Sequence, residues 1–71
     1  MVTEIMAILE EVRDAAMGLP LSDNRHQWFR RLCRTIRNAQ EDVRVTGSCS
    51  YDMAAHLASA RKLQAALKEV E

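Results

Sequence analysis

The sequence predicts an all-α fold: a three-helix, up-down-up bundle that forms a single domain over residues 1–71. Apolar residues recur every three or four positions in three segments, a spacing typical of amphipathic helices and unlike the alternation of strands. The one proline and the two glycines all fall between these segments, where helices end. Because the links are short, consecutive helices should be antiparallel neighbours.

The first helix is expected over residues 4–17, with Thr3 as its N-cap and Glu4 stabilising the positive end of the helix dipole. Gly18 can adopt the left-handed conformation that closes a helix, and Pro20 cannot continue the ladder of hydrogen bonds. The predicted apolar face consists of Ile5, Ile8, Leu9, Val12, Ala15 and Ala16.

Apolar residues outside this face indicate further packing. Leu19 and Leu21, in the link to the second helix, should pack back onto the core. Met6 and Met17 form a weaker strip with Arg13, which indicates either a contact with a second subunit or methionines scattered on the surface.

The second helix, over residues 24–45, is the longest and the most informative. Ser22 or Asp23 caps its N-terminus, and Thr46 followed by Gly47 marks its end. Its apolar stripe, at the spacing of a helix face, consists of Trp28, Phe29, Leu32, Cys33, Ile36, Ala39 and Val43.

The third helix is expected over residues 51–70, with Ser50 or Ser48 as its cap and Asp52 in its first turn. Its core side consists of Met53, Leu57, Ala60, Leu63, Leu67 and Val70. A second strip consists of Ala54, Ala58, Arg61 and Ala65. Small side chains let two helix backbones approach closely, so this strip predicts an oligomer interface; alternatively, alanine simply favours the helix at surface positions.

The length of the chain also favours an oligomer. A domain of 71 residues buries only about 60% of the surface that its unfolded chain exposes, so a monomer is marginally stable. Two cysteines and two histidines argue only weakly for a disulfide or a metal as the supplement. We therefore expect a homo-oligomer that assembles through helix faces, as a dimer or a larger ring.

Charge is balanced overall but not along the chain. The net charge of zero gives no general attraction to nucleic acid. Residues 1–24 contain five acidic side chains and one basic side chain, whereas residues 25–37 contain five arginines and no acid. At about 100° per residue, one flank of the apolar stripe carries a basic row, formed by His26, Arg30, Arg34, Arg37 and Arg44. Arg31 points elsewhere.

This basic row predicts an anion-binding site. The planar fork of arginine matches phosphate and carboxylate groups, and Trp28 or Tyr51 offers a surface on which a flat ring can stack. We expect a non-enzymatic oligomer that holds an anionic, phosphate-bearing small molecule, in particular a nucleotide. The predicted ligand-binding residues are Arg30, Arg34, Arg37, His26, Trp28 and Tyr51.

Other interpretations of the row stay open. Its arginines can pair with acids of the first helix, Glu10, Glu11 and Asp14, within a chain or between chains. The row can also dock on an acidic protein, which would make the chain an adaptor or inhibitor. Nucleic-acid binding is the third alternative, as a helix-turn-helix or as a helical dimer that holds RNA through its phosphates. The helix-turn-helix ranks lower, because both helices are long and the reading helix is mostly alanine.

The sequence gives little support for catalysis or metal binding. It contains no glycine-rich phosphate loop and no nucleophile or metalloprotease motif, so we expect neither enzymatic activity nor a cofactor. His26 and Cys33, like Cys49 and His56, are seven positions apart, too far along a helix for either pair alone to chelate zinc. His56 should be a partly buried structural histidine and Cys33 a small hydrophobe, and no disulfide between Cys33 and Cys49 is expected.

Two further absences predict a cytoplasmic protein. No apolar stretch approaches the roughly 18 residues that span a membrane, and the N-terminus lacks the pattern of a signal peptide. Two cysteines without a disulfide pattern fit a reducing compartment.

The segment from Asp52 to Glu69, DMAAHLASARKLQAALKE, resembles the last helix of small phage proteins, the anti-CBASS sponges, which are all-helical oligomers that sequester cyclic nucleotides. The similarity covers 18 of the 71 residues and consists of alanine, leucine and charged residues at helical spacing. The resemblance implies a viral, sequestering inhibitor of host defence that binds nucleotides at arginines between subunits. It implies no role for a particular residue, because the arginine-rich second helix and the break at Gly18 and Pro20 do not align with that family.

Overall fold

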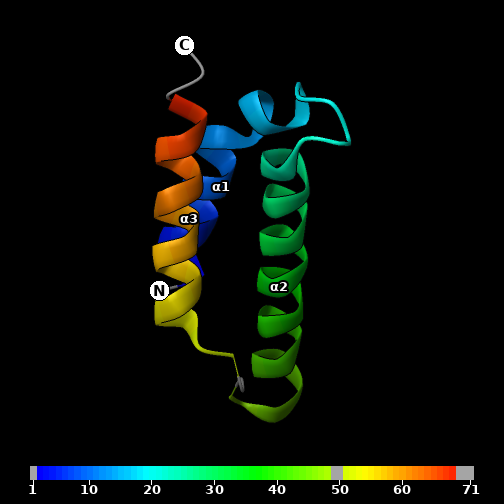
Figure 1. Ribbon diagram of the computed structural model, residues 1–71. Coiled ribbons are helices and arrows are strands. Elements are labelled where there is room, and N and C mark those ends of the chain that lie inside the picture. Colours follow the sequence, from blue (N-terminus) through cyan, green and yellow to red (C-terminus); the bar gives the residue numbers. More distant parts are fainter. Residues whose placement is uncertain (1, 49–50, 69–71) are drawn as a thin grey trace.

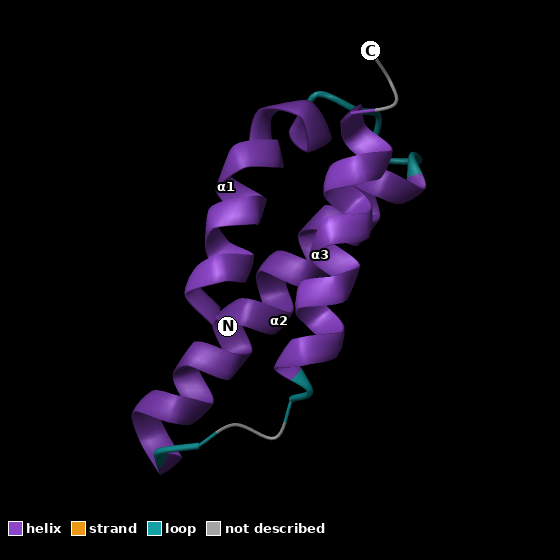
Figure 2. Ribbon diagram, turned by 90° about the vertical axis from the view of Figure 1, so that its left-hand side faces the viewer, coloured by secondary structure: helices purple, strands orange, loops and turns teal. Residues whose placement is uncertain are grey.

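The computed structural model describes residues 2–48 and 51–68, which form three helices and, within those ranges, no strand. The helices are α1 (Val2–Met17), α2 (Asn24–Thr46) and α3 (Met53–Lys68). The chain rises through α1, descends through α2 and rises again through α3 (Figures 1 and 2), and each helix contacts both others. The predicted all-α, three-helix, up-down-up bundle is confirmed.

The ends of α2 follow from the local sequence as expected. Asp23 is the N-cap, and its Oδ1 accepts a hydrogen bond of 2.8 Å from the backbone N–H of Arg25. At the other end Gly47 adopts the left-handed conformation, with φ of 82°, and donates its N–H to the carbonyl of Val43 at 2.9 Å. A side chain at that φ would be strained, so glycine is the residue that lets the helix stop there.

Three predicted helix ends are wrong in detail. Thr3 is not a cap, because α1 already begins at Val2, whose side chain packs against the core. Gly18 does not adopt a positive φ; its N–H continues the helical pattern to the carbonyl of Asp14 at 3.0 Å. Asp52 precedes α3 as its cap, since its Oδ1 accepts from the N–H of Ala55 at 3.1 Å. Ser48 therefore does not cap α3, and the alternative cap Ser50 lies outside the described residues, as do Cys49 and Val70.

The core lies where the three apolar faces meet. Its buried residues are Ile5, Leu9, Val12, Ala16, Phe29, Leu32, Ile36, Ala60, Leu63 and Leu67. Half-buried apolar side chains pack around this core, namely Val2, Ile8, Leu19, Trp28, Cys33, Met53 and Leu57. All of these except Val2 were expected on the core sides of the helices or in the link.

Three residues expected in the core are exposed instead. Ala15 lies at the edge of the α1 face, and Leu21, in the link, is 68% exposed. Val43 continues the apolar stripe of α2 but is 48% exposed. The exposure of Val43 follows from the length of α2, which has 23 residues against 16 in each of the other helices. The C-terminal end of α2 therefore extends beyond α1 and α3 (Figure 1).

The strip on α3 that predicts an oligomer interface faces outward. Ala54, Ala58 and Ala65 are exposed, and Arg61 reaches Glu4 of α1 in an exposed ion pair of 3.8 Å. Such a long, solvated pair contributes little to stability. The surface is therefore open to a second chain, and assembly through it stays a prediction.

Paired truncations test the core boundary. Ile5→Val removes one carbon from a side chain with 0% exposure and should lower the free energy of unfolding by about 1 kcal/mol. Val43→Ala removes two carbons but should change that free energy by less than about 0.5 kcal/mol, because Val43 is already in water. Urea denaturation followed by circular dichroism measures both. A larger loss at Val43 than at Ile5 would mean that another surface covers this end of α2 in solution.

Candidate functional site

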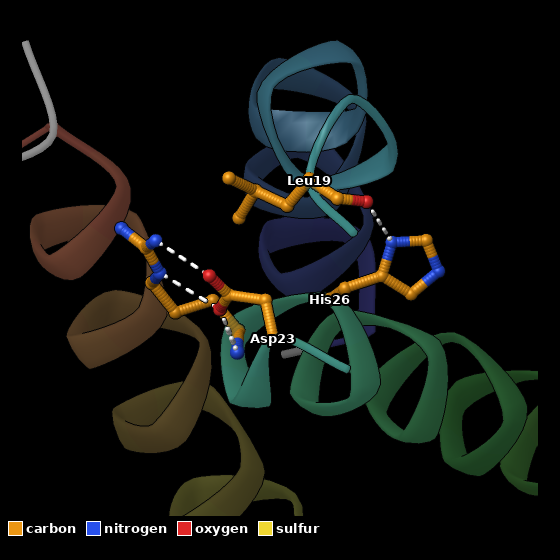
Figure 3. Close-up of polar contacts among 4 residues, drawn as sticks. Leu19, Asp23 and His26 are labelled. Atoms are coloured by element: carbon orange, nitrogen blue, oxygen red, sulfur yellow. Dashed lines mark hydrogen bonds and ion pairs between the residues drawn. The ribbon is translucent and has the colours of Figure 1, made fainter. Parts of the chain in front are cut away.

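The corner between α1 and α2 holds the one buried polar side chain in the described parts of the chain. His26 is 4% exposed, and its Nδ1 lies 3.0 Å from the carbonyl oxygen of Leu19 (Figure 3). A carbonyl only accepts, so Nδ1 carries the proton and donates it. The other ring nitrogen, Nε2, is buried without a hydrogen-bond partner. This contact ties the first turn of α2 to the residue that follows α1.

A second polar contact fixes the start of α2. The side chain of Arg25 binds Asp23 through two hydrogen bonds, Nε to Oδ1 at 3.0 Å and Nη2 to Oδ2 at 2.7 Å (Figure 3). These bonds, together with the backbone bond from Arg25, lower the pKa of Asp23 from 3.8 to about 2. The side-chain hydrogen bonding between Arg25 and Asp23 also raises the pKa of Arg25. Arg25 is thus committed to the helix cap and is separate from the basic row.

Three arginines of the row meet at one depression on the surface of α2. A cavity of about 170 Å³ is lined by Phe29, Arg30, Cys33, Arg34 and Arg37. Arg30, Arg34 and Arg37 are all exposed, while the apolar wall is formed by buried Phe29 and half-buried Cys33. The structure therefore brings together the three arginines that the sequence singled out, and it adds an apolar surface between them.

In the part of the chain that the structure describes, these guanidinium groups have no partner of opposite charge. Within residues 2–48 and 51–68, Arg30, Arg34 and Arg37 form neither an ion pair nor a side-chain hydrogen bond. The alternative in which these arginines pair with acids of α1 in the same chain is not seen among the described residues. Glu11 instead accepts a hydrogen bond of 2.9 Å from Gln64 of α3. Arg44, at the far end of the row, pairs with Glu41. The unpaired positive charge is thus concentrated over two turns of α2.

An apolar groove lies beside the arginine cavity, between α1 and α2. This groove, of about 270 Å³, is lined by Met6, Leu9, Glu10, Cys33, Ile36, Arg37 and Gln40. Gln40 crosses it to donate a hydrogen bond of 3.1 Å to the sulfur of Met6. Arg37 and Cys33 line both depressions, so the groove and the basic row are adjacent. Burial raises the pKa of the Cys33 thiol, while Arg37 and Arg13 act to lower it.

The remaining predicted ligand-binding residues lie elsewhere. His26 does not line the arginine cavity, because its ring is buried against Leu19. Trp28 faces α3, where its Nε1 donates a hydrogen bond of 2.7 Å to Ser59 Oγ. Tyr51 packs against His56, which is half-buried as expected, with ring centroids 6.2 Å apart. Neither aromatic ring is beside the three arginines.

Sequence reasoning missed the apolar lining that accompanies the row. Met6 and Gln40 contact each other across the α1–α2 groove, although they are 34 positions apart. The sequence pattern partly indicated this groove, because helical spacing places Cys33 and Gln40 at the border between the basic row and the apolar stripe. What α1 places opposite them depends on how the two helices are aligned, which periodicity does not give.

The described residues show neither a cluster of metal ligands nor a membrane-spanning helix. They contain no group of three or more histidine, cysteine or acidic side chains able to hold a metal ion. None of the three helices, over the residues described, is both long and apolar enough to cross a membrane.

Comparison with known proteins finds no matching family model, no significantly similar curated protein and no significantly similar solved structure. The resemblance of the last helix to the phage sponges therefore stays an interpretation of the sequence. The fold and the site together define a class of protein: a small three-helix bundle whose arginines, without ionic partners among the described residues, lie beside an apolar groove.

The cap at Asp23 predicts a dependence of stability on acid. A folded-state pKa of about 2, below the usual 3.8, means that the ionised carboxylate stabilises the fold above about pH 4 and that this contribution is lost as the pH falls through about 2. Asp23→Asn keeps a side chain that caps well but cannot titrate. The difference in unfolding free energy between wild type and this variant, from urea titrations, should shrink between pH 4 and pH 2. A constant difference would show that the ion pair with Arg25 does not contribute.

Proposed function

We propose that this protein is a non-enzymatic binding protein that holds an anionic, phosphate-bearing small molecule, in particular a nucleotide, on Arg30, Arg34 and Arg37. The observation that carries the proposal is the convergence of three guanidinium groups, without ionic partners in the described residues, on one cavity with an apolar wall. Each guanidinium is a rigid fork of donors that fits phosphate oxygens in pairs.

Repulsion within the row supports an anionic ligand. Arg30 and Arg34 are four residues apart and Arg34 and Arg37 are three apart, so their charges face one another on the helix surface. Like charges at these spacings destabilise a helix by a few tenths of a kcal/mol per pair. A bound phosphate would remove this repulsion and add charge-assisted hydrogen bonds, so binding should stabilise the protein.

The apolar groove supplies a surface for the uncharged part of the ligand. Since Trp28 and Tyr51 lie away from the row, we propose that a nucleobase would lie against Met6, Cys33 and Ile36 instead. Methionine sulfur makes favourable contacts with aromatic rings. The groove is open rather than enclosed, which fits sequestration or reversible binding better than chemistry that must exclude water.

The role that we propose for this binding is sequestration, in an oligomer of identical chains that contact one another through Ala54, Ala58, Arg61 and Ala65. Such a ligand trap would act in the cytoplasm as a viral inhibitor of host defence. This role matches the resemblance of the last helix to that of the phage sponges. The main alternative is an adaptor that docks the same arginines on an acidic protein. The adaptor is favoured by Met6, which lines the groove and is 43% exposed, because a helix of a partner protein would cover that side chain.

Charge-reversing variants distinguish binding at the arginine cavity from a general attraction of anions to the positive charge of the protein. Arg30→Glu with Arg34→Glu should abolish binding of ATP, used as the probe in isothermal titration calorimetry, because it replaces two donor groups by acceptors. The matched control, Arg44→Glu with Lys62→Glu, changes the net charge equally at exposed positions outside the cavity. It should retain most of the affinity, and circular dichroism should show unchanged helicity in both variants.

Native mass spectrometry of the protein as purified adds the identity of the ligand. An oligomer that carries extra mass close to that of a nucleotide, lost after denaturation and refolding, would support the proposal. Binding of ATP that survives the Arg30 and Arg34 double change would contradict the site. No adduct and no binding of ATP would instead favour the acidic protein partner.

A further inference from the structure

The opposite flank of α2 carries a second cleft, which shares no residue with the arginine cavity. It lies between α2 and α3 and has a volume of about 350 Å³. Its lining consists of Trp28, Arg31, Leu32 and Thr35 of α2 and of His56 and Ser59 of α3. From the chemistry of this lining we propose a second binding site, for a small planar aromatic anion: one ring that carries a single carboxylate or phosphate.

The cleft has a cation to bind the anionic group. Arg31 is exposed and, in the described parts of the chain, forms no ion pair and no side-chain hydrogen bond. No carboxylate lines the cleft that could compete with a ligand for this guanidinium. Thr35, one turn further along the same helix, adds a half-buried hydroxyl at the cleft. A planar carboxylate matches the fork of arginine in two parallel hydrogen bonds.

Aromatic groups line the cleft on both helices. The Trp28 indole is held in place by its hydrogen bond of 2.7 Å to Ser59, which fixes the ring relative to α3. On the α3 side the His56 imidazole packs against Tyr51, with the two rings tilted at 59°. Half-buried rings held by neighbours lose little freedom when a flat ligand stacks on them, and an aromatic pair is worth about 0.5–1.5 kcal/mol beyond its buried area.

The size of the cleft limits the ligand. Its volume falls at the lower end of the range of about 300–1,000 Å³ that is usual for small-molecule sites. Leu32 closes the floor as part of the core, so the ligand lies between the helices and does not penetrate the bundle. One ring with one anionic substituent fits these limits, whereas a larger nucleotide would extend into solvent.

The single tryptophan of the chain makes this site directly observable. The indole N–H of Trp28 gives its own cross-peak in a nitrogen–proton correlation spectrum and reports on the α2–α3 cleft alone. Benzoate, titrated into the full-length protein at millimolar concentrations, should shift this cross-peak in a saturable manner. Benzamide, which is flat but neutral, and cyclohexanecarboxylate, which is charged but not flat, should bind at least several-fold more weakly. Equal shifts from all three probes, or none from benzoate, would overturn the proposal.

A matched pair of variants tests the cation. Arg31→Gln should weaken benzoate binding at least about tenfold, because the loss of even one charge-assisted hydrogen bond has about that effect. Arg44→Gln removes the same charge from an exposed position on the same helix that lines neither the cleft nor the arginine cavity, and it should leave the affinity unchanged. If both variants weaken binding equally, benzoate responds only to the general positive charge of α2 and the site is refuted.

Discussion

The contact between His26 and the carbonyl of Leu19 acts with the buried stripe of α2 to set the rotation of that helix about its own axis. The placement of the side chains in both candidate sites depends on that rotation. His26 is the only polar side chain buried in the described residues, and its Nδ1 is held at 3.0 Å. Turning α2 would break this bond and leave a second polar atom without a partner, in addition to Nε2. A buried unsatisfied group costs about 1–3 kcal/mol, a large share of the stability of a small domain.

With α2 fixed in this way, its two flanks acquire different chemistry. On the α1 side, Arg37 lies at the groove that Met6 and Glu10 border. On the α3 side, Trp28 and Arg31 lie opposite His56 and Ser59. Since the arginines are exposed and solvated, their mutual repulsion costs the fold little compared with the loss of a buried contact. The core stabilises the bundle largely without the row, which leaves the row free to serve binding.

Much of the fold could be predicted because periodicity and capping chemistry are local. Asp23 and Gly47 bound α2 as expected, and the buried positions repeat every three or four residues. The errors arose where the outcome depends on neighbours. Val43 continues the stripe of α2 but is exposed. Over the described residues, α1 and α3 do not extend to the C-terminal end of α2 (Figure 1). His26 was predicted to belong to the basic row, but its ring is buried and donates a hydrogen bond to the carbonyl oxygen of Leu19, seven residues earlier.

The candidate site was predicted in its charge but not in its aromatic part, and helix geometry explains why. Trp28 and Arg37 are nine positions apart, which at about 100° per residue places them on opposite sides of α2. A helix with its side chains is about 10–12 Å across, so one small ligand cannot stack on Trp28 and also bind Arg37. A nucleotide held by the row would therefore place its base on the apolar surface beside the row, which Phe29 and Cys33 provide in the cavity and Met6 and Ile36 provide in the α1–α2 groove. The indole can serve only a ligand of the other cleft, where Arg31 is the cation within reach.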